Sequence, residues 1–474
     1  MERELNVYVD LKKEAIPIGR LWVNERQGKE TATFEYDARW LKLPQKFALA
    51  PNLMLSAGKF HSADGLFSAF SDPAPDRWGR KLMRHFELES ARAEERTPRT
   101  LLGSDFLAGV DDETRLGALR FKRPGDDSFL AHSGRPVPPL IELGDLLSAT
   151  DRIEKGRPRK NDIELVLAPG GSLGGARPKA TIRDHGRLHI AKFPWAQDEW
   201  PVIRWEAVVL RLAEHAGITI PPYRMVRAGA KSALLMDRFD RAPGDVRIPF
   251  MSAMTALDAQ DHSEDHSEDH SEDHSYLEIL DVIRQIGAYP AEDARELWRR
   301  MAFNVLVTNT DDHLRNHGFL WAGQGWRLSP AYDMNPAPPL VSPRIHVLAL
   351  NELEHSSSID TVMSVARGFG LSGAEARTIV GEVAEAVSNW RAVAAVQKIA
   401  RNDIDFMSGA FEHADLMEAM KLGRSAQLPV KKVASGAMAS KSPTEKGKSR
   451  KIPVAHKAAK TKVIGAASKA PPMK

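Results

Sequence analysis

The sequence predicts an α+β fold with a strand-rich N-terminal lobe and a mainly α-helical C-terminal lobe. Near the start of the chain, apolar and polar residues alternate in LNVYVDL, IPIGRLWVN and TATFEYD, as they do in half-buried strands. Later, WEAVVLRLAEHAG is amphipathic and ends at Gly217, and PAEDARELWRRMAFNVLVTN has acidic residues in its first turn, so both indicate helices. Residues 371–420 also have a helical pattern.

We expect four regions along the 474 residues, a length that suits two or three domains. Residues 1–120 form an N-terminal subdomain, and a connector with several prolines and glycines runs from 121 to 140. Residues 140–242 form a lobe of strands, and residues 243–422 form the helical lobe. Residues 423–474 form a tail.

The tail at 423–474 carries 13 Lys or Arg against one acidic residue, a net charge of +12. The whole chain has a formal charge of +3, so the body carries about −9. Because the tail has no aromatic residue and little apolar surface to bury, we expect it to be disordered. Two interpretations of its charge stay open, a phosphate-seeking arm for nucleic acid and a solubilising tail.

The segment DHSEDHSEDHSEDHS, residues 261–275, repeats a four-residue unit. Histidines at this spacing would line one face of a helix, which resembles a metal-binding array. An expanded repeat in a tolerant surface loop is the interpretation we favour, because loops accept insertions at low thermodynamic cost. The segment should then be exposed and mobile.

Several classes of protein are excluded by composition. The chain has no cysteine, which rules out disulfides, thiolate zinc sites and a cysteine nucleophile. It has no run of about 18 apolar residues, so we expect no membrane span. The N-terminal MERELNVYVDLKKE lacks an apolar signal region, which favours a cytoplasmic protein.

A glycine-rich stretch, APGGSLGGARPKATI at 168–182, is the first candidate binding motif. Its glycines let backbone N–H groups approach an anion, as in loops that surround a phosphate. The Gly-Lys-Ser/Thr triplet of a Walker A motif is missing, and a glycine-rich turn without a ligand is the more common case.

A lysine on a predicted strand is the second candidate. In RLHIAKFP, Lys192 shares a strand face with Leu188 and Ile190, and a lysine on an inward face needs an anion. Glu206, near the start of the next helix, is the candidate ion-pair partner. A solvent-exposed lysine on an edge strand is the alternative.

The stretch NVLVTNTDDHLRNHGFLW, residues 304–321, gathers polar residues between two apolar runs. Asp311 and Asn316 have the Asp-x-x-x-x-Asn spacing of the catalytic loop of protein kinases, whereas the competing Asp312 is one position too close. The segments GFLW and WRLS predict a hairpin that returns the chain and places Asp333 beside Asp311. Two carboxylates and an amide oxygen are ligands that suit Mg²⁺. A solvated turn is the alternative.

These motifs together resemble the HipA-like serine/threonine kinase toxins of type II toxin–antitoxin systems in bacteria. The resemblance is carried by GGSLGGARPKA, HIAKFP, MDRFDR, TDDHLRNHGFL and LSPAYDM, and it spans roughly residues 1–420. It implies a two-lobed, protein-kinase-like fold: 1–120 is a HipA-type subdomain, 140–242 the kinase-like N-lobe with a hinge, and 243–422 the C-lobe with the catalytic loop.

The resemblance also implies roles for single residues. Asp311 would be the catalytic aspartate, and Asn316 and Asp333 would hold Mg²⁺. Ser172 matches an autophosphorylated serine, whose modification is expected to eject the glycine-rich loop and silence the kinase. The residues expected at the nucleotide are Gly174, Gly175, Ala176, Lys179, Lys192, Asp237, Arg238, Phe239, His313 and Tyr332, with Asp237 to Phe239 forming the hinge for adenine.

The sequence departs from the family pattern at a few positions. Arg177 and Pro178 stand where relatives tend to carry Gln-Glu, and Asp312 replaces a usual glycine and adds negative charge beside Asp311. The DHSE repeat lies after the hinge. None of these changes removes a required catalytic group, so we expect an active kinase.

The predicted function is therefore an ATP- and Mg²⁺-dependent serine/threonine kinase that arrests growth. The resemblance implies a translation component, such as an aminoacyl-tRNA synthetase, as the target. It also implies a small helix-turn-helix antitoxin, HipB-like, that binds operator DNA, with the kinase at the nucleoid in that complex. Two alternatives remain: a non-catalytic co-repressor that acts with the antitoxin, and a small-molecule or lipid kinase on the same fold.

Overall fold

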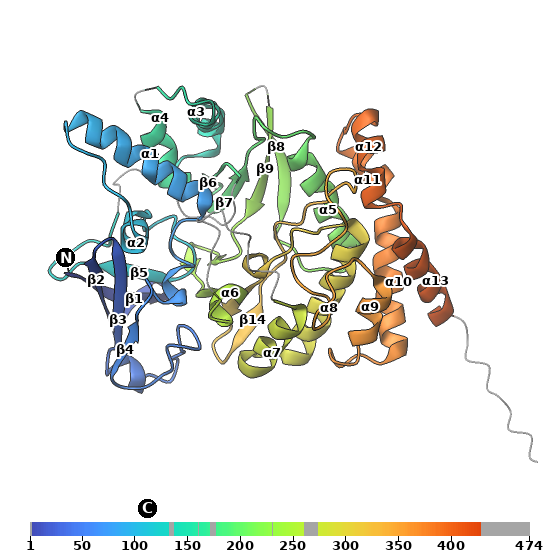
Figure 1. The fold of residues 1–474 in the computed structure, drawn as a ribbon, viewed down its shortest axis with the longest axis horizontal. Coiled ribbons are helices and arrows are strands. Elements are labelled where there is room, and N and C mark those ends of the chain that lie inside the picture. Colours follow the sequence, from blue (N-terminus) through green and yellow to red (C-terminus); the bar gives the residue numbers. More distant parts are fainter. Residues whose placement is uncertain are drawn as a thin grey trace, which may run out of the picture. The chain divides into compact units, whose positions relative to one another are not determined.

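A five-stranded antiparallel sheet forms the first part of the computed structural model (Figure 1). The structure describes residues 2–131, 137–159, 161–170, 177–229, 231–259 and 274–427. The strand order is β4-β3-β2-β1-β5, with β1 Glu2–Leu11, β2 Glu14–Arg26, β3 Lys29–Tyr36, β4 Lys59–Ser62 and β5 Leu119–Lys122. Alternate side chains of β1, namely Leu5, Val7 and Val9, are buried, as the alternating pattern predicts.

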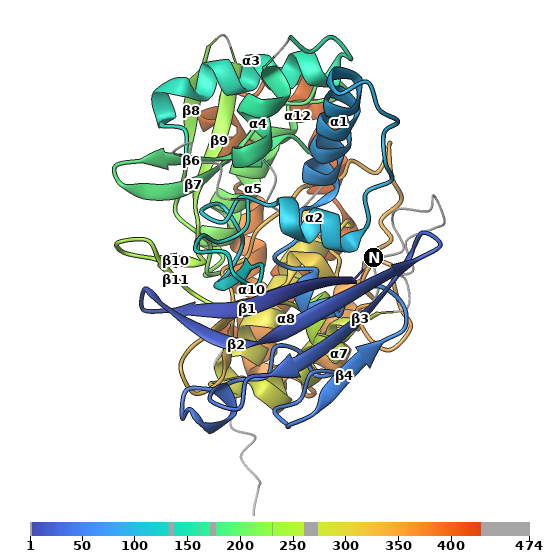
Figure 2. The ribbon, with the colours of Figure 1, turned by 90° about the vertical axis from the view of Figure 1, so that its left-hand side faces the viewer.

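Two helices lie between β4 and β5, α1 Arg77–Ala93 and α2 Gly103–Gly109. Helix α1 begins at an N-cap, Asp76, whose side chain accepts a hydrogen bond of 2.6 Å from Gly79 N. Its apolar face does not pack on the five-stranded sheet. Trp78 and Leu82 instead belong to a second core cluster with residues of α3, α4, β6 and β7, and both views of the ribbon show α1 beside α4 (Figures 1 and 2).

A four-stranded antiparallel sheet follows, in the order β6-β7-β9-β8. Its strands are β6 Lys179–Asp184, β7 Arg187–Lys192, β8 Tyr223–Ala228 and β9 Lys231–Asp237. The helices around it are α3 Leu143–Glu154, α4 Asp162–Gly170 and α5 Val202–His215. Strand β7 is an interior strand, so Lys192 does not lie on the edge that the sequence left as an alternative.

The C-terminal half is mainly helical, and the predicted hairpin is present in it. Strands β13 Gly318–Trp321 and β14 Trp326–Leu328 pair with each other, and β12 Phe250–Ser252 pairs with β13. The short strands β10 Arg241–Ala242 and β11 Val246–Arg247 form a separate pair. The helices are α6 Ala253–Ala256, α7 Tyr276–Ile286, α8 Pro290–Val307, α9 Ile359–Val365, α10 Gly373–Ser388, α11 Trp390–Val396, α12 Arg401–Met407 and α13 Ala414–Gln427.

The predicted boundary of the tail is wrong by five residues, because α13 continues through 423–427 to Gln427. The reason is packing at Gly423. A Cβ atom there would lie 2.5 Å from the Cα of Gly381, so two glycines let α13 and α10 pack closely, and Figure 1 shows the helices side by side. The rest of the predicted tail, 428–474, lies outside the described residues, as do residues 261–273 of the DHSE repeat.

The predicted α+β class, with strands first and helices later, is confirmed. All described residues belong to one compact unit, Met1–Leu428. Within the described ranges, no helix combines the length and the apolar character needed to cross a membrane.

Candidate active site

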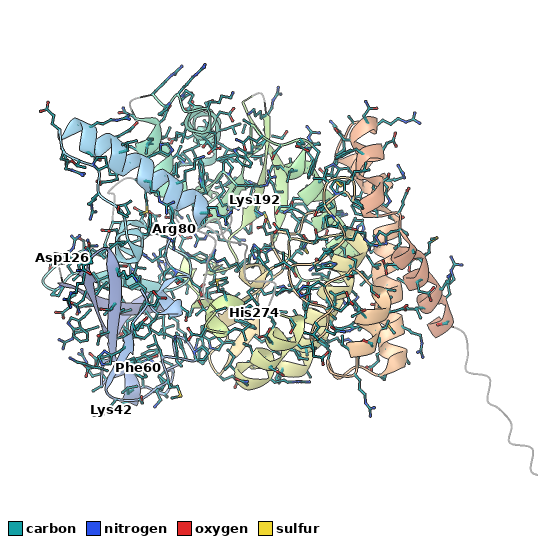
Figure 3. The ribbon with its side chains drawn as sticks, in the orientation of Figure 1. Lys42, Phe60, Arg80, Asp126, Lys192 and His274 are labelled. Atoms are coloured by element: carbon teal, nitrogen blue, oxygen red, sulfur yellow. The ribbon has the colours of Figure 1, made fainter. Side chains whose placement is uncertain are left out.

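Lys192, labelled in Figure 3, lies at the end of β7. Its ammonium contacts two carboxylates from different elements. Its Nζ is 2.5 Å from Oε1 of Glu206 on α5 and 2.8 Å from Oδ1 of Asp333, in the loop after β14. The exposed fractions of these side chains are 11% for Lys192, 2% for Glu206 and 31% for Asp333. The structure thus brings together three of the residues that the sequence singled out.

The charges of this triad depend on one another. Burial alone would lower the pKa of Lys192, but attraction to Asp333 and Glu206 outweighs it and raises that pKa above its ordinary value. In the same way, burial would raise the pKa of Asp333, but Lys192 and Lys179 hold it well below the ordinary range. Lys192 is therefore charged and Asp333 ionised at neutral pH.

Asp333 also has an unusual backbone conformation, with φ at 57° in the left-handed region. A non-glycine residue rarely adopts this conformation, and such residues persist where the surrounding structure holds them. Both hydrogen bonds to the carboxylate within the described part of the chain reach Oδ1, from Lys192 at 2.8 Å and from Asn335 Nδ2 at 3.4 Å. Lys192 and Asn335 thus hold the carboxylate through this one oxygen, Oδ1.

The stretch that carries Asp311 follows the end of α8. Thr308 ends the helix with φ at 54°, and the chain turns through a short 3-10 helix, Leu314–Asn316, into β13. Asp311 is exposed, whereas Asn316 is buried and its Nδ2 donates to the carbonyl of Asp311 at 3.1 Å. The loop therefore presents one carboxylate to the outside and fixes its backbone with the amide of Asn316.

Asp312 has a structural role that the sequence did not reveal. Its side chain is buried, and Oδ2 accepts hydrogen bonds from the hydroxyl of Tyr276 and from Asn304 Nδ2 at 2.9 Å, while Nε2 of His317 lies 2.9 Å away. Burial would raise the pKa of Asp312, but the neighbouring His317 outweighs burial and lowers it. The added negative charge at this position thus points into the core and anchors the loop.

The anchoring network reaches the loop of Asp333. Asn309 donates through Nδ2 to Oδ1 of Asn304 at 3.1 Å, and its own Oδ1 accepts from the backbone N of Asn335 at 3.2 Å. Asn335 in turn contacts Asp333. One chain of buried and partly buried hydrogen bonds therefore links the Asp311 loop to Asp333.

Residues 237–239, the expected hinge, begin at Asp237, the last residue of β9. Nδ1 of His189 lies 2.9 Å from Oδ1 of Asp237. The ring of Phe239 lies 5.3 Å from that of Tyr332, whose hydroxyl donates to the carbonyl of Arg315 at 2.6 Å. Phe239 and Tyr332 thus form an aromatic pair between the hinge and the catalytic-loop segment.

The side chain of Arg238 does not face this pair. It is fully buried and bonds to Asp240 at 2.6 Å and to the carbonyls of Thr114 at 2.5 Å and Arg115 at 3.2 Å. Arg241 donates to Asp240 at 2.6 Å and to the Arg115 carbonyl at 2.7 Å. We call this group, with Arg247 donating to the carbonyl of Asp112, the arginine clamp. It holds the segment before β5 against the hinge.

Lys179, on β6, lies directly opposite Lys192 in the register of the sheet. Its Nζ is 3.0 Å from Oδ2 of Asp76, the N-cap of α1, and both side chains are buried. Arg177 pairs with Asp198. Gly174, Gly175 and Ala176, expected at the nucleotide, and Ser172, the expected site of autophosphorylation, lie outside the described residues.

The residues present fit a nucleotide with Mg²⁺. Nδ1 of His313, directly after Asp312 in the loop, is a buried atom without a hydrogen-bond partner among the described residues. Asn316 and Asp333 have side-chain oxygens of the kind that Mg²⁺ prefers, and Lys192 and Lys179 have ammonium groups of the kind that bind phosphates.

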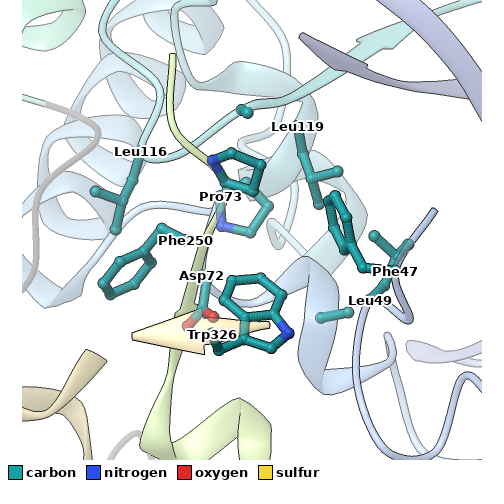
Figure 4. Close-up of a pocket in the computed structure, with 11 residues that line it drawn as sticks. Phe47, Leu49, Asp72, Pro73, Leu116, Leu119, Phe250 and Trp326 are labelled. Atoms are coloured by element: carbon teal, nitrogen blue, oxygen red, sulfur yellow. The ribbon is translucent and has the colours of Figure 1, made fainter. Parts of the chain in front are cut away.

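A small cavity of about 20 Å³ lies beside the hinge, between Phe47, Pro73, Phe250 and Trp326 (Figure 4). It has room for about one water molecule and cannot hold a nucleotide. Asp72 lines it, and burial raises the pKa of this carboxyl, whose Oδ2 accepts a hydrogen bond of 2.8 Å from Ser252 N.

Two family models match the chain. One is described as the HipA N-terminal domain and matches residues 7–104; the other is described as the HipA-like C-terminal domain and matches residues 171–390. The chain belongs to the HipA family. Its fold is also that of a chain in the Shewanella oneidensis MR-1 complex of HipA, HipB and operator DNA, with a TM-score of 0.58, 15% identity and coverage of 89% of this chain and 97% of that chain.

Two curated relatives of this HipA-family chain match over shorter segments. A Sinorhizobium fredii protein named "Putative kinase Y4mE" is 29% identical over 162 residues, which are 33% of this chain and 36% of the relative. A Haemophilus influenzae protein named "Putative kinase" is 24% identical over 220 residues, 42% of this chain and 62% of the relative. The chain thus matches less than two thirds of either relative.

The sequence interpretation missed Asp76, the buried partner of Lys179. Its signal was present, because an aspartate directly before an amphipathic helix is a typical N-cap. The pairing with Lys179 could not be seen, since 103 positions separate the two residues.

Proposed function

We propose that the chain is an ATP- and Mg²⁺-dependent serine/threonine protein kinase that acts as a growth-arresting toxin. The observation that carries the proposal is the triad in which Lys192 joins Glu206 of α5 to Asp333, beside the loop of Asp311 and Asn316. Phosphoryl transfer needs such groups because it depends on positioning and on electrostatic stabilisation of phosphate charge.

In this proposal, each residue has a separate task. Asp311, exposed at the loop, accepts the proton of a serine hydroxyl as its oxygen bonds to the γ-phosphorus, and the bond from that phosphorus to ADP breaks. Lys192, held by Glu206, contacts the phosphates, and Phe239 with Tyr332 borders adenine. Mg²⁺ offsets the phosphate charge when it is bound, with Asn316 and Asp333 as its protein ligands.

Autophosphorylation of Ser172 is part of the proposal, as is a translation component, such as an aminoacyl-tRNA synthetase, as substrate. Support for partners comes from the fold shared with the complex of HipA, HipB and operator DNA. We propose a small helix-turn-helix antitoxin as partner and operator DNA bound through it, which would place the protein at the nucleoid of the cytoplasm.

The first experiment incubates the purified chain with labelled ATP and Mg²⁺ and maps phosphate by mass spectrometry. Phosphate on Ser172 in the wild type, absent from Asp311→Gln, supports a protein kinase. Asp281→Asn, an exposed aspartate on α7, is the control for loss of one surface charge and should label like the wild type. Nucleotide binding without protein labelling favours a small-molecule kinase, and no nucleotide binding at all favours the non-catalytic co-repressor.

The basic tail is tested separately. Because α13 ends at Gln427, the deletion should begin at residue 428 and leave the helix intact. Removing 428–474 should weaken binding of the antitoxin complex to operator DNA and flatten its salt dependence, since each phosphate contact adds to the slope. An unchanged salt slope would show that the tail makes no phosphate contact.

A further inference from the structure

The two candidate phosphate lysines, Lys179 and Lys192, are cross-strand neighbours on β6 and β7, and each is paired with one buried carboxylate near a helix start. Lys192 has Glu206 on α5, and Lys179 has Asp76 at the N-cap of α1. A lysine ammonium has three N–H donors, so a carboxylate can hold it while another N–H faces a phosphate. The second pair therefore repeats the arrangement of the first.

The carboxylate of this second pair comes from the N-terminal domain. Asp76 lies within residues 7–104, the part that matches the HipA N-terminal domain. Helix α1, which Asp76 caps, packs through Trp78 and Leu82 into the same core as Val166 of α4 and Ala180 of β6. Helix α1 therefore packs against α4, which ends at Gly170 within the glycine-rich stretch, and against β6, which carries Lys179.

The pair is also well isolated from water. The side chains of Lys179 and Asp76 are 4% and 6% exposed, so their attraction is weakly screened and Asp76 has little freedom to leave. Burial raises the pKa of the Asp76 carboxyl above its ordinary value, and the neighbouring Lys179 opposes that rise.

We propose that Asp76 is a positioning residue for the nucleotide, which fixes Lys179 toward the phosphates, so that the N-terminal domain completes the phosphate site of the kinase-like lobe. The inference rests on the proposed function, since it assumes that a nucleotide binds beside Lys192. It assigns to the N-terminal domain a direct effect on nucleotide affinity.

The test is Asp76→Asn, because asparagine is as good an N-cap as aspartate and keeps an acceptor for Gly79 N while removing the charge. Affinities for ATP and for adenosine are measured by calorimetry, with melting curves to check folding. We expect ATP affinity to fall about tenfold, the size of a coupling within one charge network, and adenosine affinity to stay unchanged. A purely structural role of Asp76 would weaken both ligands together.

Two further variants sharpen the test. Asp105→Asn also removes a mostly buried, arginine-paired carboxylate of the N-terminal domain and should leave both affinities unchanged. In a Lys179→Met background, Asp76→Asn should cause no further loss of ATP affinity, because its target is gone. If Asp76→Asn does not fold, Asp76→Ser keeps a capping oxygen and carries the same expectation.

The outcomes separate the two proposals. Suppose that the wild type binds ATP and that Asp76→Asn binds it equally well, or that Asp76→Asn and Lys179→Met lower ATP affinity additively. Then the role of Asp76 is overturned and the kinase proposal stands. If the wild type binds no ATP, both are overturned. A selective loss of ATP affinity that depends on Lys179 supports both.

Discussion

Asp311 and Asp312 are adjacent aspartates whose substitutions should affect different properties. Replacing Asp312 should lower the stability of the fold, and replacing Asp311 should lower the rate of phosphate transfer. Asp312 is 4% exposed, and one of its oxygens serves the hydroxyl of Tyr276, Nδ2 of Asn304 and Nε2 of His317. Asp312→Ala leaves these three groups without their acceptor. Each unsatisfied buried group costs roughly 1–3 kcal/mol, and entry of water recovers part of that, so we expect a loss of about 3–5 kcal/mol in the free energy of unfolding.

Urea denaturation followed by circular dichroism measures this loss as a lower midpoint with an unchanged slope. Asp311→Asn is the matched comparison: its exposed side chain should change the free energy of unfolding by less than about 0.5 kcal/mol. The rate of phosphate transfer by Asp311→Asn should nevertheless fall by a factor of about 10²–10⁴, which is the usual contribution of a general base. The reasoning is refuted if Asp312→Ala unfolds at the wild-type urea concentration, or if Asp311→Asn transfers phosphate at the wild-type rate.

Three other perturbations follow from the structure. Lys192→Met should lower the free energy of unfolding by about 3–5 kcal/mol, because it leaves Glu206 buried without its cation. It should also abolish ATP binding. Adding Glu206→Met should restore the urea midpoint but not ATP binding. Phe239→Ala should weaken ATP and adenosine equally, about tenfold in calorimetry, because it removes the aromatic partner of Tyr332 at the hinge. Burial lowers the pKa of His346 to about 4, so between pH 6.5 and 4 the unfolded chain binds a proton at this residue that the folded chain does not. Stability should therefore fall as pH drops through this range. His346→Gln should flatten that part of the curve of melting temperature against pH, and an unchanged curve would contradict the expectation.

The sequence was sufficient for the elements whose pattern is local. The alternating strands, the helix that ends before Asp311 and the hairpin that returns to Asp333 all have periodic or turn signals in adjacent residues. The closeness of Lys192 and Glu206 could also be anticipated, because a short connection joins their strand and helix. The functional roles of these residues stay predictions.

What the sequence could not provide depends on contacts between distant residues or on burial. The spacing to Asn316 favours Asp311 over Asp312, but only the fold shows that Asp311 faces outward and that Asp312 accepts hydrogen bonds from Tyr276 and Asn304. The tail was placed from residue 423 onward by its charge and composition, whereas Gly423 lies inside α13 and permits close packing against Gly381 of α10.

The arginine clamp has a consequence for how the two halves recognise each other. Its bonds run from guanidinium groups of Arg238, Arg241 and Arg247 to backbone carbonyls and to Asp240 and Asp112, all largely hidden from water. Buried ion pairs of this kind gain little net free energy relative to the separated, hydrated groups. A misaligned docking, however, would bury several charged groups without their partners, which is costly. The clamp therefore contributes little to the stability of the contact. Its contribution is to the specificity of docking, because it favours one orientation of the N-terminal sheet against the hinge.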